Sequence, residues 1–219
     1  MSTRRTRRSP EEAKRLILEA AETRLAEGGV DAVRVQKIAA DLGLTDAAIY
    51  HHFGSRERLL DALARFGARR LKTAVEEVLA EVDPDSADLQ AIAALALDTF
   101  EQRGYARLVL WLSQQGIPSD RGSGMFDGLG VTFEKILNNA HPDDSDKPTL
   151  ARQARFLASL LVLVMFADPL LGTISRRSLG LGGDHKTTMQ FRTWFVDALV
   201  TLLGQGAAPA KRGRKTRGA

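Results

Sequence analysis

The chain has 219 residues, enough for one large domain or two small ones, and its 44% hydrophobic content is ordinary for a globular protein with a packed core. It has no cysteine, which excludes disulfide bonds, zinc–thiolate sites and thiol nucleophiles and favours the reducing cytoplasm. The net charge of +4 is concentrated at the ends, because basic residues crowd 4–8 and 211–217 while the body between them is acidic. We therefore expect a basic disordered arm over 1–8 and a basic disordered tail over 205–219, both able to reach a polyanion. Tails that only keep the chain soluble are the alternative.

Neither an export signal nor a membrane span is predicted. The basic start, MSTRRTRRSPEE, is not followed by the apolar run of a signal peptide. The longest apolar run, LASLLVLVMFA over 157–167, stops at Asp168 and is shorter than the ~20 residues that cross a bilayer. It is expected to be a buried helix in a cytoplasmic protein with no membrane partner.

The first helices have clear start and stop signals, and nearly every long segment has a helical period, which predicts an all-α fold. The first helix should begin after Ser9, a good N-cap, and end at the glycines 28–29. A second helix is expected over 35–42, with a tight turn at Gly43.

A third helix should begin at Thr45, whose hydroxyl is suited to capping, and break at Gly54. Ser55 then opens a long fourth helix that can run to about residue 79. The segment DPDSAD, residues 83–88, is the expected boundary before the C-terminal part. Beyond it we expect helices near 87–102, 104–115, 121–140, 149–167 and 187–204, with 141–148 and 168–185 as the segments between the last three.

A short helix, a glycine turn and a second short helix braced by a third form a helix-turn-helix, which lays its second element in the DNA major groove. Steps of about 100° per residue put Ile49 and Phe53 on the inner face of that element. Small alanines permit close approach, and tyrosine and imidazole can bond phosphates or base edges. The outer face and its flanks carry Ala47, Ala48, Tyr50 and His51. Histidines that only face solvent, with Tyr50 as packing, are the alternative.

The stretch VRVQKIAADLGLTDAAIYHHFGSRERLL, residues 33–60, resembles the DNA-binding signature of the TetR family of bacterial transcriptional regulators. The resemblance implies phosphate contacts by Thr45, Tyr50, His52 and Arg56, base-edge contacts by Ala47, Ala48 and His51, and a base or phosphate contact by Gln36. Arg34 stands where the family usually has a capping Ser or Thr; it can bond phosphate but is a poor cap. Arg24 stands where an apolar residue is common.

The resemblance also implies a helix-turn-helix DNA-binding domain over 9–55, joined by the long fourth helix to a helical effector-binding and dimerisation domain over 56–204. Its four-helix dimer interface would use Leu157, Leu160, Leu161, Val164, Phe191, Trp194, Phe195, Leu199 and Leu202. Candidates for lining an effector pocket are Leu97, Phe100, Leu108, Trp111, Phe126, Phe133 and Phe166. For each of these residues, plain intramolecular core is the alternative.

The function that follows is a homodimeric, sequence-specific regulator, most simply a repressor released from a palindromic DNA operator by a small, hydrophobic effector. The effector would displace the helix near 104–115, which would push the fourth helix and change the spacing of the recognition helices. The alternative is a DNA-binding regulator without a small-molecule effector, controlled by protein contact or expression level. A helical interaction protein is a further rival.

An enzyme is the least favoured class. The four histidines lack metal-ligand spacing, and GSGMFDG, residues 122–128, lacks the G-K-[ST] ending of a phosphate loop. No catalytic residue, metal or cofactor is expected.

Overall fold

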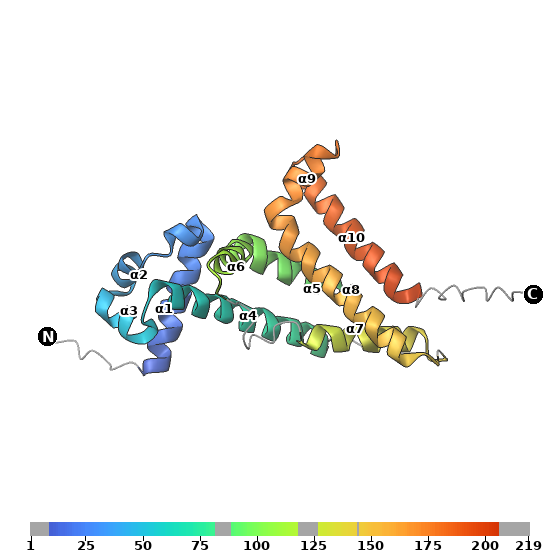
Figure 1. Ribbon diagram of the computed structural model, residues 1–219, viewed down its shortest axis with the longest axis horizontal. Coiled ribbons are helices and arrows are strands. Elements are labelled where there is room, and N and C mark those ends of the chain that lie inside the picture. The colour runs from blue at the N-terminus through green and yellow to red at the C-terminus, as the bar shows by residue number, and fades with distance from the viewer. Residues whose placement is uncertain (1–8, 82–88, 118–126, 144, 206–219) are drawn as a thin grey trace, which may run out of the picture.

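The computed structural model describes residues 9–81, 89–117, 127–143 and 145–205, and in these ranges the chain is helical with no strand. The all-α prediction is confirmed. A small domain of α1 (Pro10–Gly28), α2 (Val35–Leu42) and α3 (Asp46–Phe53) forms one end of an elongated molecule (Figure 1). The long α4 (Arg56–Glu81) leaves this domain and runs along the C-terminal helices.

Local capping residues set the limits of the N-terminal helices. Ser9 Oγ accepts a hydrogen bond from the amide of Glu12 at 3.1 Å and so begins α1. Gly43, at φ 61°, ends α2 in the left-handed conformation that glycine adopts without strain. Thr45 Oγ1 accepts from the amide of Ala48 at 3.3 Å and begins α3. These are the residues that the sequence predicts as caps.

One apolar core joins the three short helices to the start of α4. The inner faces of α1 and α2 meet a row of leucines from α4, and α3 contributes a single fully buried isoleucine. Its members are Ile17, Leu18, Ala21, Leu25, Val35, Ile38, Ala39, Ile49, Leu59, Leu60 and Leu63. Because α3 is held by this one anchor and by its neighbours, most of its surface is left outward.

Several elements of the C-terminal part follow α4 in the chain, and two of them, α5 (Leu89–Leu97) and α6 (Tyr105–Gln114), pack against it. The others include the π-helical turn η3 (Asp98–Gln102), α7 (Asp127–Ala140), α8 (Lys147–Ala167) and α10 (His185–Gln205). α7 packs along α8, and α10 contacts α5, α7 and α8. The buried side chains at these contacts include Ile92, Phe100, Leu108, Leu112, Phe133, Leu137, Leu161, Met165 and Leu199.

The segment 168–185, predicted to be a connection, is partly helical, so that prediction was wrong in part. α8 continues through a π-helical turn, η4 (Asp168–Gly172), into α9 (Thr173–Ser178). A wide turn tolerates the missing N–H of a proline. Asp168 is buried there and pairs with Arg176 and, at 2.6 Å, with Arg192 of α10. Partners this far along the chain cannot be recognised from local sequence.

Candidate nucleic-acid interface and effector cavity

The outward face of α3 and its flanks carry four of the nine residues predicted to contact DNA. The side chain of Ile49 is 1% exposed, whereas that of Tyr50 is 41% exposed. Ala47 and His51 are exposed and Ala48 is half-buried, so the wheel derived from the sequence matches the observed orientation. The surface offered to a ligand therefore combines one small residue, one phenol and one imidazole.

Three more of the predicted DNA-contacting residues flank this face, one at the end of α3 and two at the start of α2. His52 is half-buried, with its ring 5.6 Å from that of His51. Gln36 is exposed in the first turn of α2. Arg34 occupies the N-cap of α2 without a side-chain capping bond, and its Nε donates instead to the carbonyl of Asp31 at 3.0 Å. The expectation that arginine caps poorly agrees with this geometry.

Arg56 lies differently from the other predicted phosphate ligands. Its Nε donates to the carbonyl oxygen of Val33 at 2.9 Å, and its Nη2 donates to that of Val30 at 2.6 Å. Its Cζ lies 5.7 Å from the centre of the Trp111 ring on α6. The side chain is directed into the junction between the two domains, at carbonyls 23 and 26 residues away in sequence. A local motif does not reveal such contacts.

The charge of the small domain is largely internally balanced. Residues 9–60 contain seven Lys/Arg and nine Asp/Glu. Arg24 binds Asp41 through two N–H groups and thereby ties α1 to α2, and this hydrogen bonding lowers the pKa of the Asp41 carboxyl. Arg24, which stands where the family commonly has an apolar residue, is thus paired with Asp41. A net attraction for a polyanion has to come from elsewhere, and the basic arm 1–8 lies outside the described residues.

A groove beside His52 was not anticipated from the sequence. α1 and α4 border it with four basic side chains, and Glu11 lies among them. The basic residues are Lys14, Arg15, Arg65 and Arg69. Arg15 and Arg65 are paired with carboxylates on their own helices, so the groove carries less free charge than its composition indicates. Its members are far apart in sequence, and only the packing of α1 on α4 brings them together.

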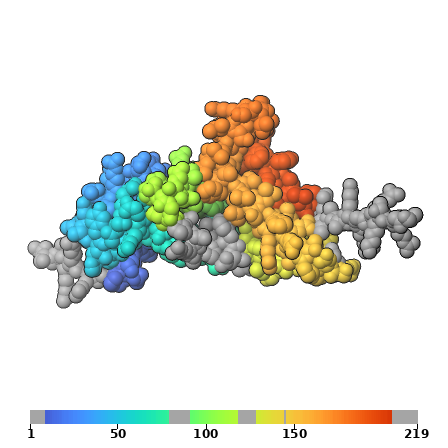
Figure 2. Space-filling view, viewed as in Figure 1, coloured from blue at the N-terminus to red at the C-terminus, as the bar shows by residue number. Residues whose placement is uncertain are grey.

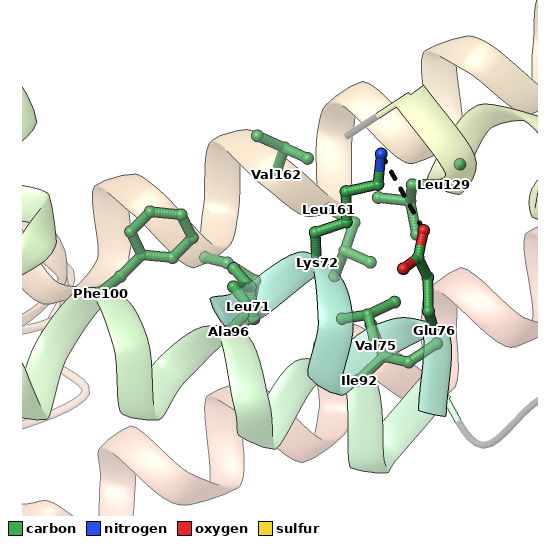
Figure 3. Close-up of a pocket in the computed structure, with 12 residues that line it drawn as sticks. Leu71, Lys72, Val75, Glu76, Ile92, Ala96, Phe100, Leu129, Leu161 and Val162 are labelled. Atoms are coloured by element: carbon green, nitrogen blue, oxygen red, sulfur yellow. Dashed lines mark ion pairs between the residues drawn. The ribbon is translucent and has the colours of Figure 1, made fainter. Parts of the chain in front are cut away.

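A cavity of about 50 Å³ lies in the C-terminal part between α4, α5, α7 and α8 (Figure 3). Its walls are apolar except for Lys72 and Glu76, an ion pair of 3.9 Å on α4. The apolar lining is Leu71, Val75, Ile92, Ala96, Phe100, Leu129, Leu161, Val162 and Met165. Pockets that hold drug-sized ligands measure about 300–1,000 Å³. A ligand of that size requires the walls to move apart.

Only Phe100, of the six predicted pocket residues that are described, lines this cavity. Leu108 and Phe133 are fully buried in the core, and Trp111 lies against Arg56. Phe166 packs edge to face on Phe100 at 5.9 Å, and Leu97 is half-buried beside the core. Phe126 lies outside the described residues. Bulky residues at helical spacing do not mark this cavity, because its walls are built mainly from aliphatic residues.

The predicted dimer residues fall into two groups. Leu157, Leu161, Phe195 and Leu199 are buried within this one chain, and Val164 and Phe191 are half-buried. Leu160, Leu202 and Trp194, which is 64% exposed, remain outward. The sequence did not predict the other exposed large apolar residues of this region, which are Phe156, Leu163, Leu171, Ile174, Leu179, Leu181, Met189 and Val200. Several of them lie around α9, which projects from the body of the molecule (Figure 2).

Comparison with known families identifies the N-terminal domain. Residues 17–63 match the model of the bacterial regulatory proteins of the tetR family. Residues 17–63 therefore form a DNA-binding domain of the TetR family. A solved structure of a TetR-family transcriptional regulator from Mesorhizobium loti superposes with a TM-score of 0.61 at 16% identity, covering 94% of this chain and 100% of that one. At this identity the likeness concerns the fold, and it extends through the C-terminal helices.

Two curated relatives match part of the chain. The nucleoid occlusion factor SlmA of Citrobacter koseri is 31% identical over 108 residues, which are 49% of this chain and 53% of SlmA. The HTH-type transcriptional repressor AcnR of Corynebacterium efficiens is 38% identical over 68 residues, 31% of this chain and 36% of AcnR. The matches thus span about half or less of these relatives. AcnR is named as a transcriptional repressor, and neither relative is named as an enzyme.

Proposed function

We propose that the chain is a homodimeric transcriptional regulator that binds a specific DNA site through α3. The observation that carries this is the exposed Ala47, Tyr50 and His51 face of a capped eight-residue helix whose inner side is fixed by Ile49. A helix of this width fits the major groove, where the distinct edges of the four base pairs are presented. The proposed domain limits are 9–55 for DNA binding and 56–204 for effector binding and dimerisation.

The residues around α3 divide by role. Tyr50, His52 and the hydroxyl of Thr45 are placed to bond phosphates, which set the orientation on DNA but carry no sequence information. Ala47, Ala48 and His51 face base edges. Alanine can make an apolar contact with a thymine methyl group, and the imidazole can form a hydrogen bond with a polar base edge. Arg34 and Gln36 approach the backbone from the start of α2. Arg24 and Asp41 hold α2 against α1 behind this surface.

A dimer follows from the uncovered apolar surface of the C-terminal part. The run Lys147–Ser178 is apolar and long enough to cross a membrane by length and composition, yet only 28% of its most apolar window is buried within the chain. Exposed apolar patches of this kind mark interfaces. A second copy related by a two-fold axis would cover Leu160, Trp194 and Leu202 and place two α3 helices for half-sites about 34–36 Å apart. Sedimentation shows whether the chain is a dimer or associates with detergent micelles.

The cavity beside α4 is the proposed effector site. Its apolar walls favour a hydrophobic molecule, and its small volume means that such a molecule would have to displace the surrounding helices. One of those helices, α4, begins in the DNA-binding domain. Effector and DNA would therefore oppose each other's binding, typically by ~1–3 kcal/mol. We infer that the chain is a repressor released by its effector, and the relative named as a repressor supports that direction.

The second candidate is a DNA-binding regulator that responds to no small molecule. The narrowness of the cavity favours it, and so does a relative that is named for nucleoid occlusion. In that case protein contact or the level of expression would control the chain. An apolar fluorescent probe that never competes with DNA would point to this alternative.

The deciding experiment is selection of bound genomic fragments by the purified full chain at physiological salt, with Tyr50→Ala and Tyr50→Phe in parallel. A short palindromic motif that is lost with alanine supports the proposal. Phenylalanine keeps the ring and loses the hydroxyl, so an intermediate affinity assigns the difference to phosphate bonding. Sequence-independent binding that ignores Tyr50→Ala would refute the role of α3, because the basic tails alone would then be engaging DNA.

A further inference from the structure

Arg56 begins α4, but its side chain turns back under the DNA-binding domain. Two of its N–H groups are used by the carbonyls of Val30 and Val33, at 2.6 and 2.9 Å. These carbonyls belong to η1 (Val30–Ala32) and to the residue after it, which stands two residues before the start of α2. The guanidinium therefore fixes the segment that leads into the helix-turn-helix. Charged hydrogen bonds of this length are among the stronger ones in proteins.

The other face of the same guanidinium meets the C-terminal domain. Its Cζ lies 5.7 Å from the centre of the Trp111 ring, within the range of a cation–π contact. Both side chains are half-buried, which reduces screening by water. α6 itself contacts η1. Arg56 is thus held between the start of α2 and the middle of α6.

The position of α6 is fixed independently at its N-terminal end. Tyr105 donates its hydroxyl proton to Glu22 Oε1 of α1 at 2.8 Å, and Arg70 of α4 binds the other oxygen of Glu22 at 2.6 Å. Because the N-terminal end of α6 is anchored to α1, a rotation of α6 relative to α4 would displace mainly residues further along α6, where Trp111 lies. Arg56 is the group on α4 that this rotation would disturb.

We propose that Arg56 is a positioning residue that sets the orientation of α2 and α3 by joining η1 to Trp111, and that it does not bind a DNA phosphate. The inference deepens the proposed function and rests on it. A planar guanidinium can bond two carbonyls in its plane while its face lies on a ring, whereas a lysine ammonium cannot satisfy these three contacts together. An arginine is thus required here for reasons unrelated to DNA charge.

The test exploits Trp111, which belongs to α6 and not to the DNA-contacting face. Operator affinity of the full chain is measured over a range of salt concentrations for Trp111→Leu, Arg56→Lys and the double variant. Leu110→Ala is the matched control, because Leu110 is an exposed neighbour on the same helix. We expect each single variant to bind roughly threefold to thirtyfold more weakly, the range that corresponds to a lost cation–π contact. The double variant should be no weaker than the weaker single one.

The salt dependence separates positioning from phosphate binding. Replacing a phosphate ligand by alanine lowers the slope of log affinity against log salt by about 0.9. Because the proposal is that Arg56 does not bind a phosphate, Arg56→Ala should leave this slope unchanged. A lower slope for Arg56→Ala, together with wild-type affinity for Trp111→Leu, would overturn the inference and restore Arg56 to the phosphate ligands.

Hydrogen exchange gives a readout that needs no operator. Amides of residues 33–38 should exchange faster in Trp111→Leu than in Leu110→Ala, with amides of α10 unchanged in both. Equal exchange in the two variants would overturn the inference. If the wild type selects no operator but this difference is present, the proposed function fails while the connection through Arg56 stands. Trp111→Phe keeps a ring, and its near-normal behaviour would exclude general unfolding as the cause.

Discussion

Gly67 lies on α4 against the ring of Tyr105, the first residue of α6. A Cβ at this position would overlap the tyrosine ring, and even Cδ1 would be only 2.8 Å away. Tyr105 is 2% exposed and donates to Glu22, so the ring has no free space into which it can retreat. Burial raises the pKa of its hydroxyl, which therefore stays protonated and keeps donating. Gly67→Ala is thus the smallest change that tests this contact.

Three contributions set the size of the effect. Alanine improves helix propensity by about 1 kcal/mol. Overpacking a filled core costs roughly 1–3 kcal/mol. Displacement of the hydroxyl from a charged acceptor costs about 1.5–3 kcal/mol more. The net expectation is a loss of ~1.5–5 kcal/mol in the free energy of unfolding, so the sign is opposite to the one that propensity alone predicts.

The assay is urea unfolding at one fixed protein concentration, because a dimer's stability depends on concentration. Gly128→Ala is the matched control. Gly128 is also helical, and a Cβ there meets nothing within 4 Å, so this change should stabilise by up to about 1 kcal/mol. Combining Gly67→Ala with Tyr105→Leu should give less than the sum of the two losses. Equal, stabilising effects of Gly67→Ala and Gly128→Ala would refute the reasoning.

Three further outcomes are expected. Asp168→Asn leaves Arg176 and Arg192 buried without their shared carboxylate, so the free energy of unfolding in urea should fall by ~3–5 kcal/mol. The pKa of Asp41 is lowered by Arg24 below its ordinary 3.8, so the pair stabilises above that pH and is lost as the pH falls through the lowered value. Stability measured from pH 6 to pH 2 should therefore fall less steeply at the acidic end in Arg24→Met. Removal of residues 1–8, with four arginines, should lower the salt slope of operator binding by up to ~3.6 and leave the selected motif unchanged.

The N-terminal helices could be predicted closely because their limits depend on neighbours in sequence. Ser9 and Thr45 cap within three residues, and Gly43 ends a helix through its own backbone conformation. The outward face of α3 follows from the same local periodicity, since one buried anchor, Ile49, fixes the orientation of the other positions. Local rules therefore sufficed for this part of the candidate site.

The sites that sequence did not predict depend on distant partners. Arg56 finds its carbonyls 23 and 26 residues back and its ring 55 positions ahead, so a motif that marks it as a phosphate ligand cannot detect them. The helix past Asp168 depends on Arg192, 24 residues on. The cavity walls are aliphatic residues from four helices, and their composition does not differ from that of the core. Each of these features is decided by packing.

The location of the cavity changes the expected order of events on effector binding. The sequence-based expectation was that the effector moves α6, which then pushes α4. The cavity lies instead against α4, at Leu71, Lys72 and Val75, while α6 is fastened to α1 through Tyr105. A ligand that widens the cavity would press on α4 first and displace it relative to an anchored α6. Since Arg56 begins α4 and rests on Trp111, that displacement reaches the DNA-binding domain at the residue that holds η1 in place.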